Sequence, residues 1–316
     1  MLRSTILAAS RNKRVENLVT HAPVSRSVVQ RFVGGADTAG AVDAARGLVA
    51  DGLTITLDHL GEDTVDRAQA DGVVDAYLEL LAALKHAGLT TELRPLTACS
   101  DLSVKLSAIG QSLPGDGAAI ALDNARRICA AAAEIGASVT LDAEDHTTTD
   151  STLSVLRELR ADFPNTSAVV QAYLHRTLGD CHDLASAGSR VRLCKGAYRE
   201  PAGVAFQKRE EVDLNYVRCV NVLLGGAGYP MFATHDPRLI AIAADRALWH
   251  GRKHDEFEFQ MLYGIRPDEQ RRLAAIGHTV RVYIPYGAEW YGYLMRRLAE
   301  RPANLAFFGR ALVTKS

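Results

Sequence analysis

Short β-rich runs alternate with amphipathic helical stretches along this chain. Helical patterns of apolar positions are clear in residues 63–88 and 267–277. The β-rich runs occupy residues 53–61, 102–110, 138–145, 167–174, 190–198, 230–236, 257–264 and 280–287. A repeated order of strand then helix is typical of parallel strands joined by crossover helices. Eight such units predict an α/β fold, a (β/α)8 or TIM barrel.

Residues 1–52 precede the first predicted strand, and they include the helical pattern SRSVVQRFVGG at 25–35. We expect this N-terminal helical segment to pack on the bottom or the edge of the barrel. The chain is therefore divided into two parts, residues 1–52 and a catalytic barrel at 53–316. A length of 316 residues suits this division, because such barrels commonly take ~250 residues as one domain.

The amino-acid composition argues against some classes of binding partner. Basic residues number 36 and acidic residues 37, so no global field attracts nucleic acid or an anionic membrane. No apolar run approaches the ~20 residues that a membrane helix needs. The five cysteines are odd in number and widely spaced, which favours reduced thiols and a cytoplasmic location.

Several predicted strands end in a cluster of polar or glycine residues. These clusters are LDAED, RLCKGAY, ATHD and VYIPYG. In (β/α)8 barrels the active site forms at the carboxyl ends of the strands, so the four clusters point to one shared pocket.

Two lysines, Lys105 and Lys195, fall inside or at the end of predicted strands. A partly buried lysine at such a site can act as a Schiff-base nucleophile when its pKa is lowered. The alternative is a permanent cation that pairs with Asp142 or Glu144 or binds an anion, and the residues alone favour this alternative.

A metal site is conceivable from the histidines and carboxylates near the strand ends. The candidate ligands are His59, His146, His175, His235, Asp58 and Asp142. Tight ligand spacings such as HxH or HExxH are absent from the sequence, so we predict no metal.

Arg296 and Arg297 follow the last strand on a predicted helix that also carries Trp290 and Tyr293. One interpretation is a solvated helix face with an Arg296–Glu300 pair at i,i+4 spacing. The other is a pair of planar cations aimed at a bound carboxylate from a helix over the barrel mouth. The density of aromatic residues on this helix favours the second interpretation.

Nucleotide-binding loops of the usual kinds are not predicted. The glycine-rich stretches at 34–40 and 225–228 fit neither the GxGxxG spacing after a strand nor the P-loop pattern. Any cofactor must then bind in the barrel itself.

Several motifs together resemble those of flavin-dependent proline dehydrogenase, in its short monofunctional bacterial form. They are RLCKGAYREP, VQAYLHR, FATHD, EFQMLYGIR and RVYIPYGAEWYGYLMRRLAER, with KLSAIG and LDAEDH upstream. The likeness covers about residues 100–310 and is weaker from residue 26. It implies a distorted barrel that holds FAD on its strand ends, with the final helix over the mouth.

The resemblance also implies an activity and its partners. The expected reaction is oxidation of L-proline to 1-pyrroline-5-carboxylate by hydride transfer from proline C5 to flavin N5. This is the first step of proline catabolism to glutamate, and the electrons pass to a membrane quinone. A separate 1-pyrroline-5-carboxylate dehydrogenase would take the product, and a cytoplasmic location is compatible with peripheral attachment to the inner face of the membrane.

Site residues follow from the same resemblance. Arg192 matches the arginine beside flavin N5, and Asp142 matches the active-site aspartate. The cations expected to bind the proline carboxylate are Lys105, Arg296 and Arg297, and the residues expected to wall the proline ring are Tyr283 and Leu262. The positions expected to contact the flavin are Ala143, Gln171, Arg192, Lys195, Gly196, Ala197, Thr234 and His235.

Two other classes stay open at this point. One is a barrel lyase or isomerase that uses a Schiff base or a metal, and the other is a non-catalytic amino-acid-binding barrel. The presence of Asp142, Arg192 and both arginines in one expected pocket argues against a non-catalytic role.

Overall fold

The fold is a closed barrel of eight parallel strands. The computed structural model describes residues 31–61, 64–90, 92–94, 97–186 and 188–300. Around the barrel the strands follow the order β1, β10, β9, β8, β7, β6, β5, β4, and β4 pairs again with β1. Their bounds are Thr54–His59 for β1, Ser100–Val104 for β4, Ser138–Leu141 for β5, Ser167–Gln171 for β6, Arg190–Cys194 for β7, Tyr229–Ala233 for β8, Glu258–Leu262 for β9 and Thr279–Tyr286 for β10.

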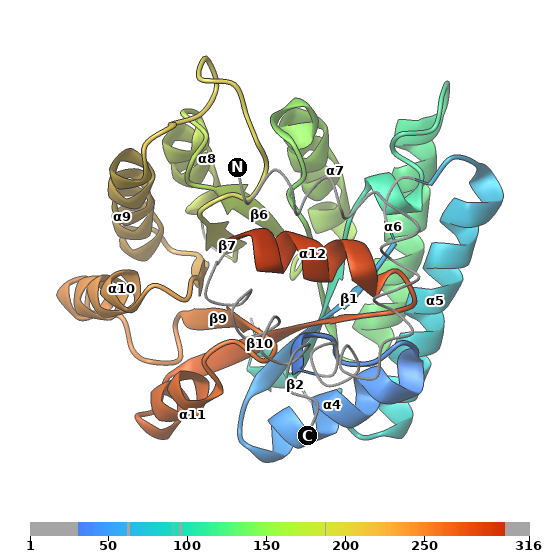
Figure 1. Cartoon of the computed structure of the whole chain (residues 1–316), viewed down its shortest axis with the longest axis horizontal. Helices are drawn as coiled ribbons and strands as arrows, with labels where there is room; N and C mark the ends of the chain where they lie inside the picture. Colours follow the sequence, from blue (N-terminus) through green and yellow to red (C-terminus); the bar gives the residue numbers. More distant parts are fainter. Residues whose placement is uncertain (1–30, 62–63, 91, 95–96, 187, 301–316) are drawn as a thin grey trace, which may run out of the picture.

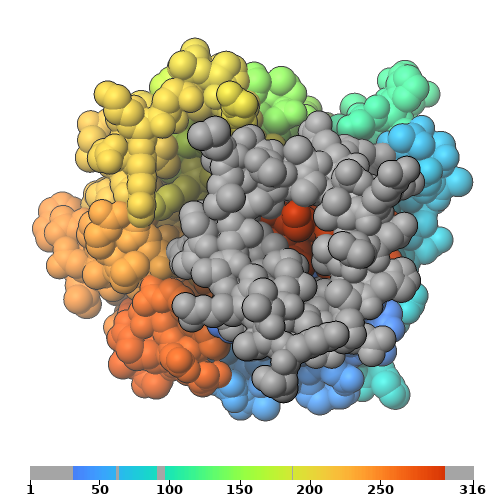
Figure 2. Space-filling view, viewed as in Figure 1, coloured from blue at the N-terminus to red at the C-terminus, as the bar shows by residue number. Residues whose placement is uncertain are grey.

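Helices surround the barrel, as Figure 1 shows. They are α4 (Thr38–Ala50), α5 (Arg67–His86), α6 (Gly117–Glu134), α7 (Thr149–Asp162), α8 (Thr177–Leu184), α9 (Arg209–Gly225), α10 (Pro237–Trp249), α11 (Pro267–Ala275) and α12 (Trp290–Glu300). Short 3-10 turns lie at Ser107–Ile109 and His146–Thr148, and a small ribbon pairs β2 (Glu92–Arg94) with β3 (Thr97–Ala98). Figure 2 shows the same view in space-filling form, with α9, α10 and α11 in yellow to red-orange along the left edge.

Local sequence sets where the helices begin. Asp37 and Asp66 precede α4 and α5, and each carboxylate accepts a hydrogen bond from a backbone N–H of the first turn. Asp236 does the same for α10, whose first residue is Pro237. Proline suits that position because it lacks the N–H that the helix would leave unpaired. These caps place the start of each helix just after a loop at the barrel mouth.

Alternation along the strands separates two buried faces. The outward positions are apolar, for example Ile55 and Leu57 on β1 and Val280 and Val282 on β10, and they pack in the main core against the helices. The inward positions of the same strands are largely polar, yet they are also buried. Successive strand residues point to opposite faces, so the alternation itself produces an apolar shell around a polar interior.

The polar interior contains paired charges near the amino ends of the strands. Arg281 is fully buried, and its Nε donates to Glu258 at 2.7 Å. Its Nη1 and Nη2 donate to the carbonyl oxygens of Ile55 and Ala98 at 2.7 and 2.9 Å. Arg281 therefore ties β10 to β9, β1 and β3 at the seam where the first and last barrel strands meet.

A second charged group sits beside it. Asp101 is fully buried and accepts hydrogen bonds from Ser138 Oγ at 2.7 Å and Thr140 Oγ1 at 2.9 Å. Burial raises its pKa, but the guanidinium groups of Arg190, Arg281 and Arg192 outweigh burial and hold the pKa of Asp101 below its usual value. The carboxylate is thus charged inside the barrel.

The helix α4 packs on the outer faces of β1 and β10 and against α5. Before α4, the chain is pinned to the end of β10, because Gly34 N donates to Pro285 O at 2.8 Å and Gly287 N donates to Gly35 O at 3.0 Å. A side chain at Gly34 would place its Cβ 2.3 Å from a methyl group of Ile284, so only glycine allows this approach.

The last helix, α12, leaves the outer ring. In Figure 1 it crosses the barrel opening, drawn in red in front of the strands. Trp290, Tyr291, Tyr293, Leu294 and Met295 are all buried. The aromatic face predicted from the sequence is therefore packed and not solvated.

The predicted (β/α)8 barrel is confirmed, with a strand that overlaps each of the eight predicted runs. The strands end earlier than predicted, and β4, β8 and β10 begin one or two residues before their runs. The run at 190–198, for instance, is strand only through Cys194, and the run at 102–110 contains the end of β4 and then a 3-10 turn. The division at residue 52 stays a prediction, and most of the helix expected at 25–35 lies outside the described residues.

We expect Arg281→Met to lower the free energy of unfolding by roughly 3–5 kcal/mol, because it leaves Glu258 charged, buried and unpaired. Urea unfolding measures the change. The matched control is Arg272→Met on α11, whose pair with Glu269 is 55% exposed on the arginine side and should cost less than about 1 kcal/mol. Equal losses in the two variants would contradict the role of the seam pair.

Candidate active site

Four polar side chains meet at the carboxyl ends of the strands. They come from the end of β4 (Lys105), the end of β5 (Asp142), β7 (Arg192) and β10 (Tyr283). Tyr283 Oη donates to Asp142 Oδ2 at 3.0 Å, Arg192 Nη1 lies 3.7 Å from Asp142 Oδ1, and Lys105 Nζ lies 3.9 Å from Asp142 Oδ2. The carboxylate of Asp142 is thus the centre of the group.

Two hydrogen bonds and a ring contact hold the guanidinium of Arg192 in place. Its Nη1 donates to Ser103 Oγ at 3.0 Å and its Nη2 to Asp101 Oδ2 at 3.4 Å. The guanidinium also lies over the ring of Tyr283, 5.4 Å from the ring centre. Its Nε is buried and has no hydrogen-bond partner within the described part of the chain. A buried donor of this kind is costly unless a ligand satisfies it.

The ionisation of Tyr283 suits a hydrogen-bond donor. Burial of its hydroxyl, and then the neighbouring carboxylate of Asp142, raise the pKa of Tyr283 well above its usual value. The phenol therefore stays protonated and donates to Asp142 at any ordinary pH.

Lys105 has a closer acidic partner than the sequence indicated. Its Nζ donates to Asp58 Oδ1 at 2.8 Å, and both side chains are at most 10% exposed. Burial raises the pKa of Asp58, and the charge of Lys105 opposes that effect. Of the two partners considered from the sequence, Asp142 is a secondary contact of Lys105, while Asp58 was missed in this role. The available signal was its polar, inward position near the end of β1.

Hydrogen bonds from neighbouring side chains hold the segment that follows Asp142 in place. Gln171 is buried, and its Nε2 donates to the Glu144 carbonyl at 2.8 Å. The Glu144 carboxylate accepts from Ser107 N at 3.1 Å and from Ser107 Oγ. Burial raises the pKa of Glu144, and the Ser107 hydrogen bonds oppose this. Gln171 and Glu144 thus set the backbone on which Ala143 lies.

Lys195 lies just after β7 and pairs with carboxylates other than Asp142. Its Nζ donates to Asp213 and to Asp236 Oδ2, the latter at 3.2 Å. Arg238 bridges the same two carboxylates at 3.0 and 2.8 Å. The Lys195 amine is thus engaged by two carboxylates and is not free to attack a carbonyl, which removes support for Lys195 as a Schiff-base nucleophile.

The ends of β8 and β9 are joined through a histidine. Leu262 N donates to His235 Nε2 at 2.8 Å, so the ring carries its proton on Nδ1 if it is neutral. Thr234 is buried, and its Oγ1 accepts from Asp236 N at 3.1 Å. The predicted residues Thr234, His235 and Leu262 therefore lie together at one side of the mouth.

Two of the predicted residues lie on a tight turn after β7. Gly196 has φ of +108°, a conformation that favours glycine, and Ala197 follows it. Arg296 and Arg297 fall in the backbone of α12, but their side chains lie outside the described residues.

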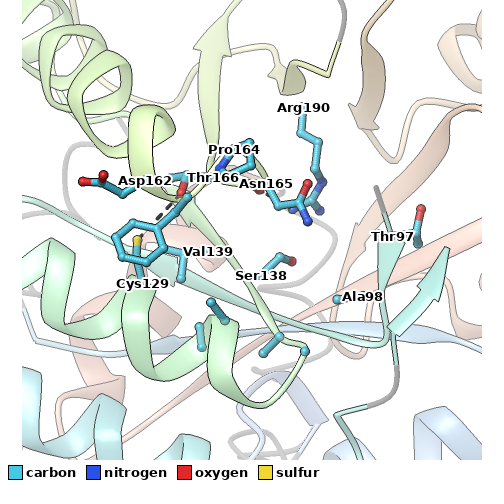
Figure 3. Close-up of a pocket in the computed structure, with 15 residues that line it drawn as sticks. Thr97, Ala98, Cys129, Ser138, Val139, Asp162, Pro164, Asn165, Thr166 and Arg190 are labelled. Atoms are coloured by element: carbon cyan, nitrogen blue, oxygen red, sulfur yellow. Dashed lines mark hydrogen bonds between the residues drawn. The ribbon is translucent and has the colours of Figure 1, made fainter. Parts of the chain in front are cut away.

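A cavity of about 180 Å³ lies at the opposite end of the barrel. Figure 3 shows it beside Ser138, Thr166 and Arg190, which stand at or next to the amino ends of β5, β6 and β7. In this fold chemistry is found at the carboxyl ends, so the Asp142 group is the better candidate. Among the described residues no group of three or more His, Cys, Asp or Glu could hold a metal ion. No helix in the described ranges has the length and apolar character to cross a membrane.

Comparison with known proteins agrees with this geometry. The chain is 41% identical to a proline dehydrogenase of Deinococcus radiodurans over 309 residues, which is 97% of this chain and 96% of the relative. It is 36% identical to proline dehydrogenase 1 of Bacillus subtilis over the whole of both chains. Among solved structures, proline utilization A from Bdellovibrio bacteriovorus, inactivated by N-propargylglycine, matches with a TM-score of 0.82 and 25% identity. That match covers 100% of this chain and 38% of the longer one.

A family model described as proline dehydrogenase matches residues 41–310, a range that contains every barrel strand and the whole Asp142 group. Since this range is most of the chain and the relatives match nearly end to end, the chain belongs to the proline dehydrogenase family, oxidoreductases that carry out the first step of proline catabolism.

Proposed function

We propose that this chain is a flavoenzyme that oxidises L-proline to 1-pyrroline-5-carboxylate with FAD bound at the barrel mouth. The observation that carries the proposal is the Asp142 group, in which Arg192, Lys105 and Tyr283 surround one carboxylate at the strand ends. A membrane quinone would take the electrons, and a separate 1-pyrroline-5-carboxylate dehydrogenase would use the product. The motif resemblance supports these two partners and a cytoplasmic enzyme in peripheral contact with the membrane.

The residues present fit a flavin. The buried Nε of Arg192 needs an acceptor, and a ring nitrogen of a flavin offers one. At Gly196 the absence of a Cβ lets the backbone after β7 pack directly against the ring of Tyr173. The residues that would hold FAD are Ala143, Gln171, Arg192, Lys195, Gly196, Ala197, Thr234 and His235. When bound, the flavin supplies at N5 an acceptor for the hydride that leaves C5 of proline.

Arg192 would stabilise the charge that develops at the acceptor. Its guanidinium is already fixed by Ser103, Asp101 and the ring of Tyr283. A cation that is already in place does not have to move when negative charge develops on the acceptor. Its attraction to that charge therefore stabilises the transition state without a reorganisation cost. Asp142 would orient Arg192 and Tyr283 in this arrangement.

Charge balance bears on how proline is bound. Four basic and four acidic side chains form a charge column along the barrel interior: Arg281, Arg190, Arg192 and Lys105 with Glu258, Asp101, Asp142 and Asp58. The formal charges of these eight side chains sum to zero, and Lys105 is already paired with Asp58. The group therefore holds no excess positive charge for a substrate carboxylate. We therefore assign most of that task to Arg296 and Arg297 of α12, with Lys105 as a third contact and with Tyr283 and Leu262 beside the proline ring.

The decisive experiment is anaerobic addition of L-proline to the purified protein while the visible spectrum is recorded. We expect flavin bands that bleach on addition, and FAD that is released into solution by denaturing precipitation. A colourless protein that reduces NAD with proline would sink the proposal. Trapping of substrate on Lys195 by borohydride would favour a lyase, and binding of proline without bleaching would favour a non-catalytic barrel.

The arginine pair gives a second test. Arg296→Met or Arg297→Met should weaken proline binding at least tenfold, because each removes a charge-assisted hydrogen bond worth about 1.5–3 kcal/mol. Bound FAD should be largely retained. Steady-state KM and kcat/KM measure the effect, with Arg272→Met on α11 as the surface control. Unchanged proline affinity in both variants would mean that Arg296 and Arg297 belong to a solvated helix face and do not bind the substrate.

Substrate choice should depend on Tyr283. Its hydroxyl hydrogen is already donated to Asp142, so Tyr283 has no donor left for a 4-hydroxyl group on the proline ring. We expect L-proline to be preferred over trans-4-hydroxy-L-proline by roughly ten- to two-hundredfold in kcat/KM, which corresponds to about 1–3 kcal/mol. Tyr283→Ser should narrow that ratio, mainly through slower proline turnover. Equal efficiency for the two substrates in the unmodified enzyme would show that Tyr283 does not limit the pocket.

A further inference from the structure

A buried carboxylate lies in the loop between β7 and α9, which is yellow in Figure 1. Glu200 is only 8% exposed. Its Oε1 accepts a hydrogen bond from His146 N at 2.9 Å and from Tyr173 Oη at 3.2 Å, and its Oε2 contacts His146 Nδ1. A carboxylate in a surface loop normally stays in water, because burial of its charge is unfavourable. The burial of Glu200 therefore indicates that its contacts have a structural role.

These three residues belong to three successive loops at the barrel mouth. His146 follows β5 and comes four residues after Asp142, Tyr173 comes two residues after the end of β6, and Glu200 comes six residues after the end of β7. Strands β5, β6 and β7 are neighbours in the barrel. Glu200 therefore links the loop after β7 directly to the loop after β5 and also contacts the loop after β6. We call the three residues the mouth clasp.

The clasp reaches the flavin-facing turn through Tyr173. Its ring lies directly against Gly196, where a Cβ would come within 2.2 Å of a ring carbon. Tyr173 N donates to Lys195 O at 2.8 Å, and Phe206 N donates to Tyr173 O at 2.8 Å. Burial, and then the carboxylate of Glu200, raise the pKa of Tyr173, so its hydroxyl remains a donor.

Further contacts close the loop around the clasp. Gln207 Nε2 donates to the carbonyl oxygens of Glu200 and Ala205 at 3.2 and 2.9 Å. Tyr173, Leu174 and Ala205 form a small buried cluster of their own, apart from the main core. The loop therefore meets the barrel mouth through this apolar cluster and, at Glu200, through a buried carboxylate.

We propose that Glu200 is a positioning residue for the cofactor, acting through His146 and Tyr173. It sets the segment that begins at Asp142 and the turn at Lys195–Ala197 in their relative places before the flavin binds. A preformed site binds more tightly, because less chain has to be ordered on binding. The proposal rests on the flavin-dependent function argued above and adds residues that touch no reacting atom.

The test compares how fast FAD leaves the holoenzyme. Glu200→Gln removes the charge but keeps the side-chain shape, and Tyr173→Phe removes a single donor while the ring stays against Gly196. The matched control is Glu210→Gln in the first turn of α9, which is close in sequence but exposed to solvent. FAD release is followed by the recovery of flavin fluorescence after dilution, and thermal unfolding in excess FAD reports overall stability.

We expect FAD release to be about tenfold faster or more in Glu200→Gln, since charge-assisted hydrogen bonds are lost, and a few-fold faster in Tyr173→Phe. The double variant should show less than the product of the two effects, because both residues act in one network. The control should release FAD at the parent rate. If Glu200→Gln folds poorly, Tyr173→Phe still decides the question.

The outcomes separate this inference from the proposed function. Release at the parent rate in both variants, with the flavin still bleached by proline, overturns the clasp alone. A lower unfolding temperature without faster release also overturns it, since that result assigns Glu200 to stability only. A parent protein that carries no flavin overturns the proposed function and the clasp together.

Discussion

The structure depends on matched charges buried inside the barrel. Strand residues alternate, and the outward set is committed to the apolar contact with the helices, so the inward set can be polar only if its groups satisfy one another. Arg281 with Glu258 and Asp101 with Arg190 and Arg192 meet this condition. Because removing one member leaves another charge unpaired and buried, the column links β1, β4, β7, β9, β10 and the end of β5 as one unit.

The active-site geometry follows from this interior. Among the arginines of the charge column, Arg192 is the one nearest the mouth, and it donates hydrogen bonds to Asp101 and Ser103. Its Nη1 donates to Ser103 and its Nη2 to Asp101, while Nε is a buried donor that remains for a ligand. An arginine on a mobile loop would have to be ordered on binding, whereas this one is preorganised by the layer beneath it.

Sequence patterns predicted the barrel and the location of its site, because both depend on local alternation and on the polar ends of strands. They did not predict the interior. Asp101 and Glu258 have the pattern expected of solvent-facing strand positions, and only closure of the sheet makes them buried. Contacts between distant residues were missed for a similar reason. Asp58 and Lys105 are 47 positions apart and Glu200 and His146 are 54 apart, and no local period links them.

The place of α12 follows from the other end of the chain. In a regular barrel the last helix would pack against the first and last strands, but here α4 occupies the outer faces of β1 and β10. Backbone hydrogen bonds from Gly34 to Pro285 and from Gly287 to Gly35 fix α4 at the point where β10 ends. With that position filled, the chain after β10 has to turn elsewhere, and α12 crosses the opening (Figure 1). We propose that this place lets α12 carry the two arginines, Arg296 and Arg297, that bind the anionic group of the substrate.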